Sequence, residues 1–324
     1  MGRVACDVYS LVRPLTPVLF ISVLGCAQKI TRMVPASTPT PSTDCVDLDE
    51  DGYGEGVDCL GPDCDDRTAW LHDTCGRCPT PCAEMVAVPG GPFGMGGDFG
   101  PLTEQPSAAT RSVTVSAFAI DATEVTVAQY DACVAVGHCK KANIGHSILE
   151  DKCHGIHPNR ENHPVNCVTW TMAVEYCRFV GKRLPTEAEW EKAARGTDGR
   201  NFPWGNELPT CDRANYALVA RRGGAAVENY CVGDPTPVGM YPLGNSPHGA
   251  ADMAGNLWEW TADWFDETHQ LTGSDVDPQG PTAGTERVVR GGAWDYGPDS
   301  LRTYERASFA PDAWRNYVGF RCAR

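Results

Sequence analysis

The chain has 324 residues, of which 21% are charged, and its formal net charge is −15. This length is enough for one large domain or two modest ones with a buried core. Because an acidic surface repels phosphate backbones, the charge argues against a nucleic-acid partner and favours divalent cations and basic partners.

Residues 1–26 have the pattern of a secretory signal. Arginines precede an apolar run, residues 15–24, that is too short to span a bilayer as a stable anchor. The run leads into Val-Leu-Gly-Cys, which resembles a bacterial lipobox, so Cys26 is predicted to become the lipidated first residue of the mature protein. Ordinary signal-peptidase cleavage is the alternative. We therefore expect an exported protein with a lipid anchor in the bacterial cell envelope. The Ala-Gln after Cys26 lacks an Asp retention signal, which favours the outer membrane.

Two different segments follow the signal. Residues 27–44 are predicted to be a tether, because their Pro, Ser and Thr keep a chain extended and soluble. Residues 45–82 form a predicted acidic, cysteine-rich module with six cysteines, and the stretch 44–66 holds ten Asp or Glu and no Lys or Arg. With almost no large apolar residues, this module needs cross-links or metal to hold its structure.

Residues 47–58 of this module match the pattern of a calcium-binding loop. Carboxylates at the first, third and fifth positions converge when the chain turns at Gly52, and a carbonyl and two later acids complete an oxygen shell that suits calcium. The preceding prolines exclude an EF-hand pair, and the segment is similar to short Asp-rich segments of bacterial surface proteins. A solvated acidic spacer is the alternative. The predicted ligands are Asp47, Asp49, Asp51, Tyr53, Glu55 and Asp58.

The cysteines predict disulfides. Of sixteen, two lie in the signal segment, six in the acidic module and eight between residues 133 and 322. Even counts in an exported chain favour structural disulfides over redox or zinc sites, including for the closely spaced Cys-x2-Cys-x3-Cys run of the module. Cys211 and Cys231 flank one loop and are a candidate pair, and the sequence alone leaves the connectivity open.

From residue 85 the composition is that of a globular domain, and alternating apolar residues over 113–120 predict a strand. Three helices have recognisable ends. They are a helix from a capping box at Thr126 and Gln129 to Gly137, one from a Thr171 cap to Gly181, and one from a capping box at Thr186 and Glu189 to Gly196. The Gly-, Pro-, Asn- and Trp-rich remainder, 197–324, predicts short strands joined by long ordered loops.

Residues 84–324 carry a series of motifs in a fixed order. They are Met85-Val-Ala-Val-Pro-Gly-Gly-Pro-Phe, Ile120-Asp-Ala-Thr-Glu-Val-Thr, His163-Pro-Val, Gly181-Lys-Arg-Leu-Pro-Thr-Glu-Ala-Glu-Trp-Glu, Pro203-Trp-Gly-Asn, Ala214-Asn-Tyr, Gly255-Asn-Leu-Trp-Glu-Trp, Arg290-Gly-Gly and Gly319-Phe-Arg-Cys. In this number and order they resemble the sulfatase-modifying-factor family, to which the formylglycine-generating enzymes belong. The resemblance implies an α+β, C-type-lectin-like fold with little regular secondary structure, here preceded by the small acidic module.

The resemblance also implies structural features. One family calcium site would use Asp252, the carbonyls of Gly255 and Leu257, and Glu259, a set of oxygens that suits calcium. A buried structural acid is the alternative role for Glu259. Another family site would use Asn215 and the Tyr216 carbonyl, but its expected Asp falls near Tyr230, so a complete cage is not expected there. Cys177 and Cys322 align with a family disulfide.

The active-site positions of the family are changed in this chain. Formylglycine-generating enzymes carry two reactive cysteines that bind copper as thiolates, and Tyr296 and Leu301 stand in their place. A family serine and a family asparagine are replaced by Ala293 and Tyr317. Copper is therefore not expected, although Asp295, Asp299 and Tyr296 would give the pocket a polar lining. Iron is weakly indicated, because the only histidine cluster (His154, His157 and His163, beside Cys153) has irregular spacing.

Three functions remain open at this stage. The chain is expected to be a calcium-stabilised binding module for a peptide, protein or glycan, without formylglycine-generating activity. The alternative is a non-standard metal-dependent oxidoreductase of the formylglycine-generating and non-heme iron superfamily, and a third possibility is a structural surface protein. Whether the chain is an enzyme stays undecided from the sequence, because a fold alone does not imply a function.

Overall fold

The computed structural model describes residues 83–97, 110–142, 152–153, 159–218, 229–267 and 274–324. The chain divides into two compact units, residues 1–42 and 43–324, and all described residues belong to the second. The predicted lipidation site Cys26, the tether and the acidic module with its calcium loop lie outside the described residues.

The regular elements are short and mixed, as the α+β expectation requires. The strands are β1 (Met85–Val88), β2 (Gly91–Met95), β3 (Arg111–Val115), β4 (Phe118–Asp121), β5 (Trp258–Trp264), β6 (Arg287–Arg290), β7 (Arg306–Phe309) and β8 (Val318–Gly319). The helices are α1 (Val127–Ala135), α2 (Trp170–Phe179) and α3 (Glu187–Arg195), with 3-10 turns η2 (Pro242–Gly244) and η3 (Pro298–Leu301). Among the described residues, no helix is long and apolar enough to cross a membrane.

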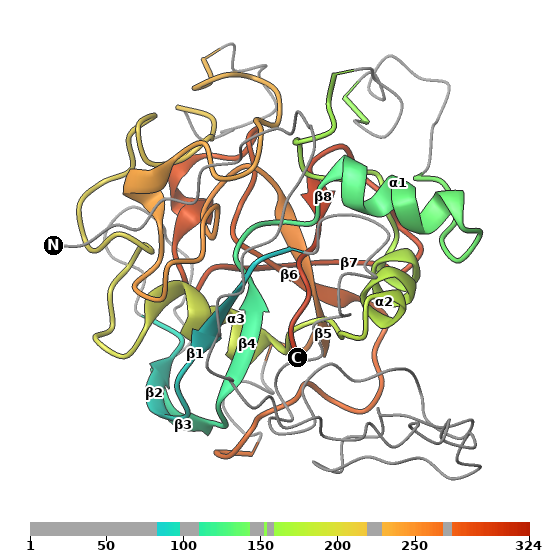
Figure 1. Ribbon diagram of the computed structural model, residues 1–324. Coiled ribbons are helices and arrows are strands. Elements are labelled where there is room, and N and C mark those ends of the chain that lie inside the picture. Colours follow the sequence, from blue (N-terminus) through green and yellow to red (C-terminus); the bar gives the residue numbers. More distant parts are fainter. Residues whose placement is uncertain (1–82, 98–109, 143–151, 154–158, 219–228, 268–273) are drawn as a thin grey trace, which may run out of the picture. The chain divides into compact units, whose positions relative to one another are not determined.

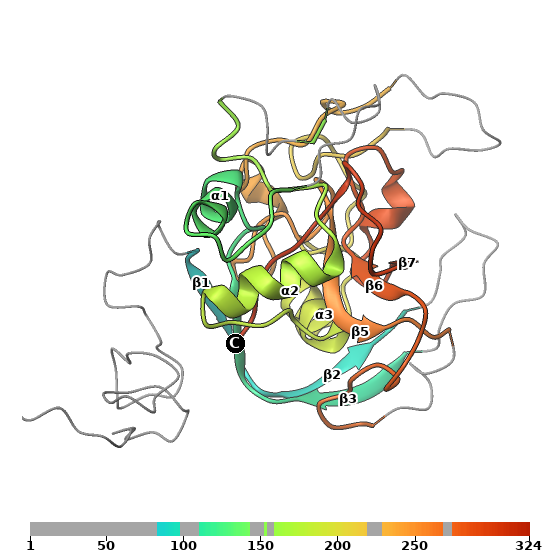
Figure 2. The same ribbon diagram turned by 90° about the vertical axis from the view of Figure 1, so that its right-hand side faces the viewer.

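The strands form three small sheets (Figure 1). The largest has the order β7-β6-β5-β8, in which β5 and β8 are parallel and the other neighbours are antiparallel. The other two are the antiparallel pairs β1–β4 and β2–β3. Helix α3 contacts both the β2 strand and the β5 and β6 strands, and Figure 2 shows it between these sheets.

The single strand predicted over 113–120 is in fact two strands in two sheets. β3 ends at Val115 and β4 begins at Phe118. The break occurs because Asp277 accepts hydrogen bonds from both the backbone N–H (2.6 Å) and the hydroxyl (2.8 Å) of Ser116. The alternating apolar residues do lie in strands, as predicted. The hydrogen bonds that interrupt the strand come from Asp277, which is distant in the sequence.

The helix starts are set by threonine caps. The capping boxes predicted at Thr126 and Thr186 are both present, and each threonine accepts a hydrogen bond from the residue three positions later. The predicted cap at Thr171 is wrong by two residues. Thr169 caps α2 instead, because its hydroxyl accepts from the Met172 N–H.

The core lies between the large sheet and the helices. One cluster joins α1 and α2 to β5 and to the chain end through residues such as Tyr130, Tyr176 and Phe320, whose rings contact one another. A second cluster packs the β1–β4 strands against α3 through Trp190. The last residues of the chain therefore belong to the centre of the domain.

Candidate functional site

A cavity of about 420 Å³ is lined by two of the four expected active-site positions, Tyr296 and Tyr317. We call it the tyrosine pocket; its lining includes Trp258 from β5, Tyr296, Asp299 and Ser300 at η3, Glu305 beside β7, and Tyr317 before β8. The structure thus brings Tyr296 and Tyr317 together, although 21 positions separate them in the sequence.

Aromatic rings form one wall of the tyrosine pocket. The Tyr296 ring is 5.5 Å from the Trp258 ring, with the two planes at 90°, and 5.5 Å from the Tyr317 ring, with the planes at 64°. Steep angles of this kind are favoured edge-to-face arrangements. The rings therefore brace one another and present a fixed aromatic corner to the cavity.

The other wall of the tyrosine pocket is acidic. Glu305 is half-buried, its Oε2 atom has no hydrogen-bond partner, and burial raises the pKa of its carboxyl to about 7. The cations that act on Glu305 are engaged with other carboxylates: Arg302 contacts Asp299 at 2.8 Å, and Arg290 contacts Glu191 at 2.6 Å. A cation bound beside Glu305 would lower this pKa and favour the ionised carboxylate.

Leu301 and Ala293 do not contribute reactive groups to this pocket. Leu301 is fully buried in a cluster with Phe202, Ala214 and Tyr216, and Ala293 is also fully buried. Leu301 therefore contributes to packing.

All eight cysteines of residues 83–324 are described, and all are in disulfides. The bridges are Cys133–Cys139, Cys153–Cys167, Cys177–Cys322 and Cys211–Cys231. The structure thus pairs Cys177 with Cys322 and Cys211 with Cys231, the two pairings proposed from the sequence. Cys153 is bonded to Cys167, and His154 and His157 of the weak iron cluster lie outside the described residues.

The residues expected to bind calcium between β5 and the preceding loop are buried. Asp252 lies in the left-handed region (φ 56°), and its carboxylate accepts from the Gly239 N–H at 2.6 Å. Glu259 accepts from Arg321 through both oxygens (2.7 and 2.8 Å) and from the Trp190 indole at 2.8 Å. Its Oε1 takes one of these bonds, so that oxygen has room for a further partner.

A third carboxylate, Glu124, lies beside this pair and was not predicted as a site residue. It accepts from the Asn256 amide (2.8 Å) and the Leu257 N–H (3.1 Å), which fixes the Gly255–Leu257 turn. Burial and the charges of Asp252 and Glu259 raise its pKa well above the usual range, and burial raises that of Asp252 to about 6. Three buried acids thus face one buried cation, Arg321.

Hard oxygen donors with a shortage of positive charge fit a calcium ion. No three His, Cys, Asp or Glu side chains in the described part of the chain gather closely enough to hold a metal alone. A cation here would therefore draw on backbone carbonyls as well, as expected for Gly255 and Leu257. At the other family position, the Asn215 Oδ1 atom is buried without a partner, while the Tyr216 carbonyl accepts from the Cys231 N–H.

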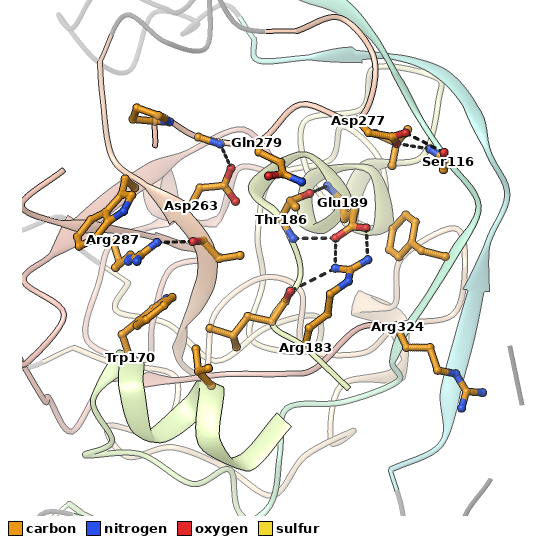
Figure 3. Close-up of a pocket in the computed structure, with 18 of the residues that line it drawn as sticks. Ser116, Trp170, Arg183, Thr186, Glu189, Asp263, Asp277, Gln279, Arg287 and Arg324 are labelled. Carbon is orange, nitrogen blue, oxygen red and sulfur yellow. Dashed lines mark hydrogen bonds and ion pairs between the residues drawn. The ribbon is translucent and has the colours of Figure 1, made fainter. Parts of the chain in front are cut away.

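A larger cavity of about 680 Å³ lies between α2, α3 and the end of β5. Figure 3 shows its polar side chains arranged around the opening, among them Arg183, Glu189, Asp263 and Arg287. The Arg287 guanidinium lies between the rings of Trp170 (3.7 Å) and Trp264 (3.5 Å). We call it the arginine–tryptophan cavity.

Several charged groups of the arginine–tryptophan cavity are held by hydrogen bonds (Figure 3). Arg183 donates two hydrogen bonds to Glu189, at 2.7 and 2.6 Å. Asp263 accepts from the N–H groups of Glu187 and Gly280, and burial together with the Glu187 charge raises its pKa to about 7. These groups stabilise the loops around α3. This cavity therefore has fewer polar groups left to bind a ligand than the tyrosine pocket has.

The profile of the sulfatase-modifying factor enzyme 1-like domain family matches residues 72–324. The chain belongs to this family. The mouse formylglycine-generating enzyme is 34% identical over 292 residues, covering 77% of this chain and 77% of the mouse protein. The formylglycine-generating enzyme of Streptomyces coelicolor is 35% identical over 282 residues, covering 74% of this chain and 88% of the relative. The solved structure of PvdO from Pseudomonas aeruginosa is 27% identical, with a TM-score of 0.62, and covers 76% of this chain and 96% of PvdO.

These comparisons confirm the expected fold of the formylglycine-generating-enzyme type. Within this sulfatase-modifying-factor domain, the motifs located Tyr296 and Tyr317 but missed Trp258 and Glu305. Trp258 belongs to the Gly-Asn-Leu-Trp-Glu-Trp motif, so the alternation of its tryptophans was the available signal. Glu305 lies in no motif, and only the pairing of β6 with β7 brings it to the pocket.

Proposed function

We propose that this chain is an exported lipoprotein whose sulfatase-modifying-factor domain is a calcium-stabilised binding module without formylglycine-generating activity. The export signal and the lipobox at Cys26 support envelope anchoring, which labelling with a fatty-acid analogue would test against a Cys26→Ser variant. The tyrosine pocket is the binding site in this proposal. Its ligand is an exported molecule, since the domain would face the outside of the inner membrane.

One observation carries the non-catalytic part of the proposal: among the residues that the structure describes, no cysteine near the tyrosine pocket is a free thiol. Tyr296 and Leu301 occupy the positions of the cysteine pair, and every cysteine of residues 83–324 is held in a disulfide. Copper(I) requires soft sulfur donors. Phenol and leucine side chains provide none, so copper-dependent oxidation of a cysteine substrate loses its metal centre.

We expect no conversion of a peptide containing Cys-x-Pro-x-Arg. The purified protein is incubated with calcium, a reductant and oxygen, and with copper or iron in separate reactions. Mass spectrometry then reads the peptide cysteine. Unchanged peptide under every metal is the expected result, because neither metal finds the thiolates that the family chemistry uses.

The Streptomyces coelicolor relative serves as the positive control for the peptide and the reagents. A Tyr296→Cys/Leu301→Cys variant restores two thiols at the family positions, and copper(I) uptake by this variant but not by the natural chain would support the reasoning. Aldehyde formation by the natural chain would refute it and select the oxidoreductase alternative.

Calcium is expected to raise the melting temperature. If calcium binds the folded domain alone, a concentration of 100 Kd adds about 2.7 kcal/mol to the free energy of unfolding. For a domain of this size that corresponds to roughly 5–10 °C. The increase arises because the cation relieves the repulsion among Glu124, Asp252 and Glu259.

Thermal unfolding of metal-stripped protein with calcium, with magnesium and with a chelator measures this effect. Asp252→Asn should lower the calcium-dependent increase, while Glu161→Gln, an exposed change, should leave it intact. An unchanged melting temperature in calcium would show that Arg321 alone balances the buried acids, as in the alternative role for Glu259.

A further inference from the structure

The tyrosine pocket has an excess of negative charge that its own residues do not balance. Asp299 is paired with Arg302, and Arg306, the one cation among the described residues of the lining, is paired with Glu187. Glu305 keeps one buried oxygen without a partner. A buried acceptor in this state costs free energy until a donor reaches it.

The aromatic side chains that line the same cavity are suited to a positive charge. The faces of Trp258, Tyr296 and Tyr317 carry the negative side of the ring quadrupole, which attracts ammonium groups within about 6 Å. Two of these rings exist because the pocket has tyrosines where the family has a cysteine and an asparagine. The same substitutions, at Tyr296 and Tyr317, therefore remove family active-site residues and add aromatic rings to the pocket.

We propose that the tyrosine pocket binds an organic ammonium cation, with its charge against the rings of Trp258, Tyr296 and Tyr317 and opposite the Glu305 carboxylate. This inference rests on the proposed binding function and names the ligand class of the same site. The ammonium comes either from a small quaternary amine or from a lysine side chain of a peptide; both share the chemistry that the pocket recognises.

Two features favour an organic cation over a metal ion. No three acidic, histidine or cysteine side chains converge among the residues that the structure describes, so the pocket acids do not form a metal cage. A cavity of about 420 Å³ also falls in the range of small-molecule sites and is far larger than a dehydrated ion needs. In the arginine–tryptophan cavity, by contrast, Arg183 pairs with Glu189, and both oxygens of the buried Asp263 already accept backbone hydrogen bonds.

Binding is expected to strengthen as the pH rises through about 7. Burial raises the pKa of Glu305 to about 7, Arg290 and Arg302 act against this increase, and Asp299 adds to it. Asp295 and Arg306 also line the pocket, and Arg306 is neutralised by Glu187. Below that pH the carboxyl is protonated and neutral, so an ammonium ligand loses its charged partner; above it the attraction is complete.

Calorimetric titration of the purified full-length protein tests this inference. The probes are choline, its neutral isostere 3,3-dimethyl-1-butanol, and Nα-acetyl-lysine methylamide. We expect choline or the lysine derivative to bind at least tenfold more tightly than the neutral isostere, and their ranking identifies the source of the ammonium. Tyr296→Leu should weaken binding about tenfold or more. Glu305→Gln should weaken it several-fold and remove the pH dependence between 6 and 8.

Glu161→Gln is the matched control, because it removes an exposed carboxylate elsewhere and should leave binding and its pH profile unchanged. Melting temperatures of all variants verify that they are folded. Equal binding of choline and the neutral isostere, no binding of either cation, or binding that persists in both pocket variants would overturn the inference. Since peptide turnover is measured separately, these results would leave the non-catalytic proposal standing, whereas aldehyde formation would remove it.

Discussion

Replacement of Arg321 by methionine is expected to lower the free energy of unfolding by about 3–5 kcal/mol. The guanidinium is fully buried and donates to both oxygens of Glu259 and to the carbonyls of Asp121 and Ala251. Without it, Glu259, Asp252 and Glu124 remain in the interior with no positive charge. Breaking a buried ion pair from one side leaves an uncompensated charge, which is why the effect is large.

Urea denaturation monitored by tryptophan fluorescence measures this loss. Arg200→Met is the control, because Arg200 pairs with the exposed Asp198, and removal of such a surface pair should change stability by less than about 1 kcal/mol. An Arg321→Met/Glu259→Gln double variant should recover part of the loss, since it removes both charges. If the Arg321→Met and Arg200→Met variants were equally stable, the buried Arg321 guanidinium would not be a main source of stability.

Removal of the Cys177–Cys322 disulfide by a double alanine substitution should destabilise the domain by about 5 kcal/mol, according to the chain-entropy relation. The bridge closes a loop with a sequence separation of 145, so its loss restores much freedom to the unfolded chain. It also joins α2 to the chain end in the buried core. Cysteine-to-alanine changes remove little volume, which keeps the packing contribution small.

The Cys133–Cys139 bridge is the matched comparison, because it closes a loop with a separation of only 6 and should be worth about 2 kcal/mol. Both double variants are compared in urea under non-reducing conditions. Equal losses would mean that strain or residual structure in the unfolded chain outweighs loop length. A smaller loss for the long loop would contradict the prediction.

Features fixed by neighbours in the sequence were predictable. The capping boxes at Thr126 and Thr186 depend on residues three positions apart, so the sequence contains the whole interaction. The start of α2 could not be predicted in this way, because Thr169 and Thr171 are both possible N-caps. In the structure Thr169 is the N-cap. The break after Val115 depends on Asp277, whose distance along the chain hides it from local patterns.

The same distinction between local and distant contacts applies to the candidate site. Tyr296 and Tyr317 could be located because motifs of known order flank them, but nothing in the sequence indicates that Glu305 faces them. Its position depends on β6 and β7 pairing in one register. Glu124 was likewise visible only as a motif residue, and its role beside Asp252 and Glu259 arises from contacts over more than 120 positions.

The place of Phe320, Arg321 and Cys322 in the core affects how the domain is made. Ala323 pairs with both Ile120 of β4 and Arg183 before α3, so this segment joins parts of the domain that are far apart in the sequence. Until residues 320–323 are in place, Tyr130 and Tyr176 lack the Phe320 ring that they pack against, so we expect the core to close late in folding.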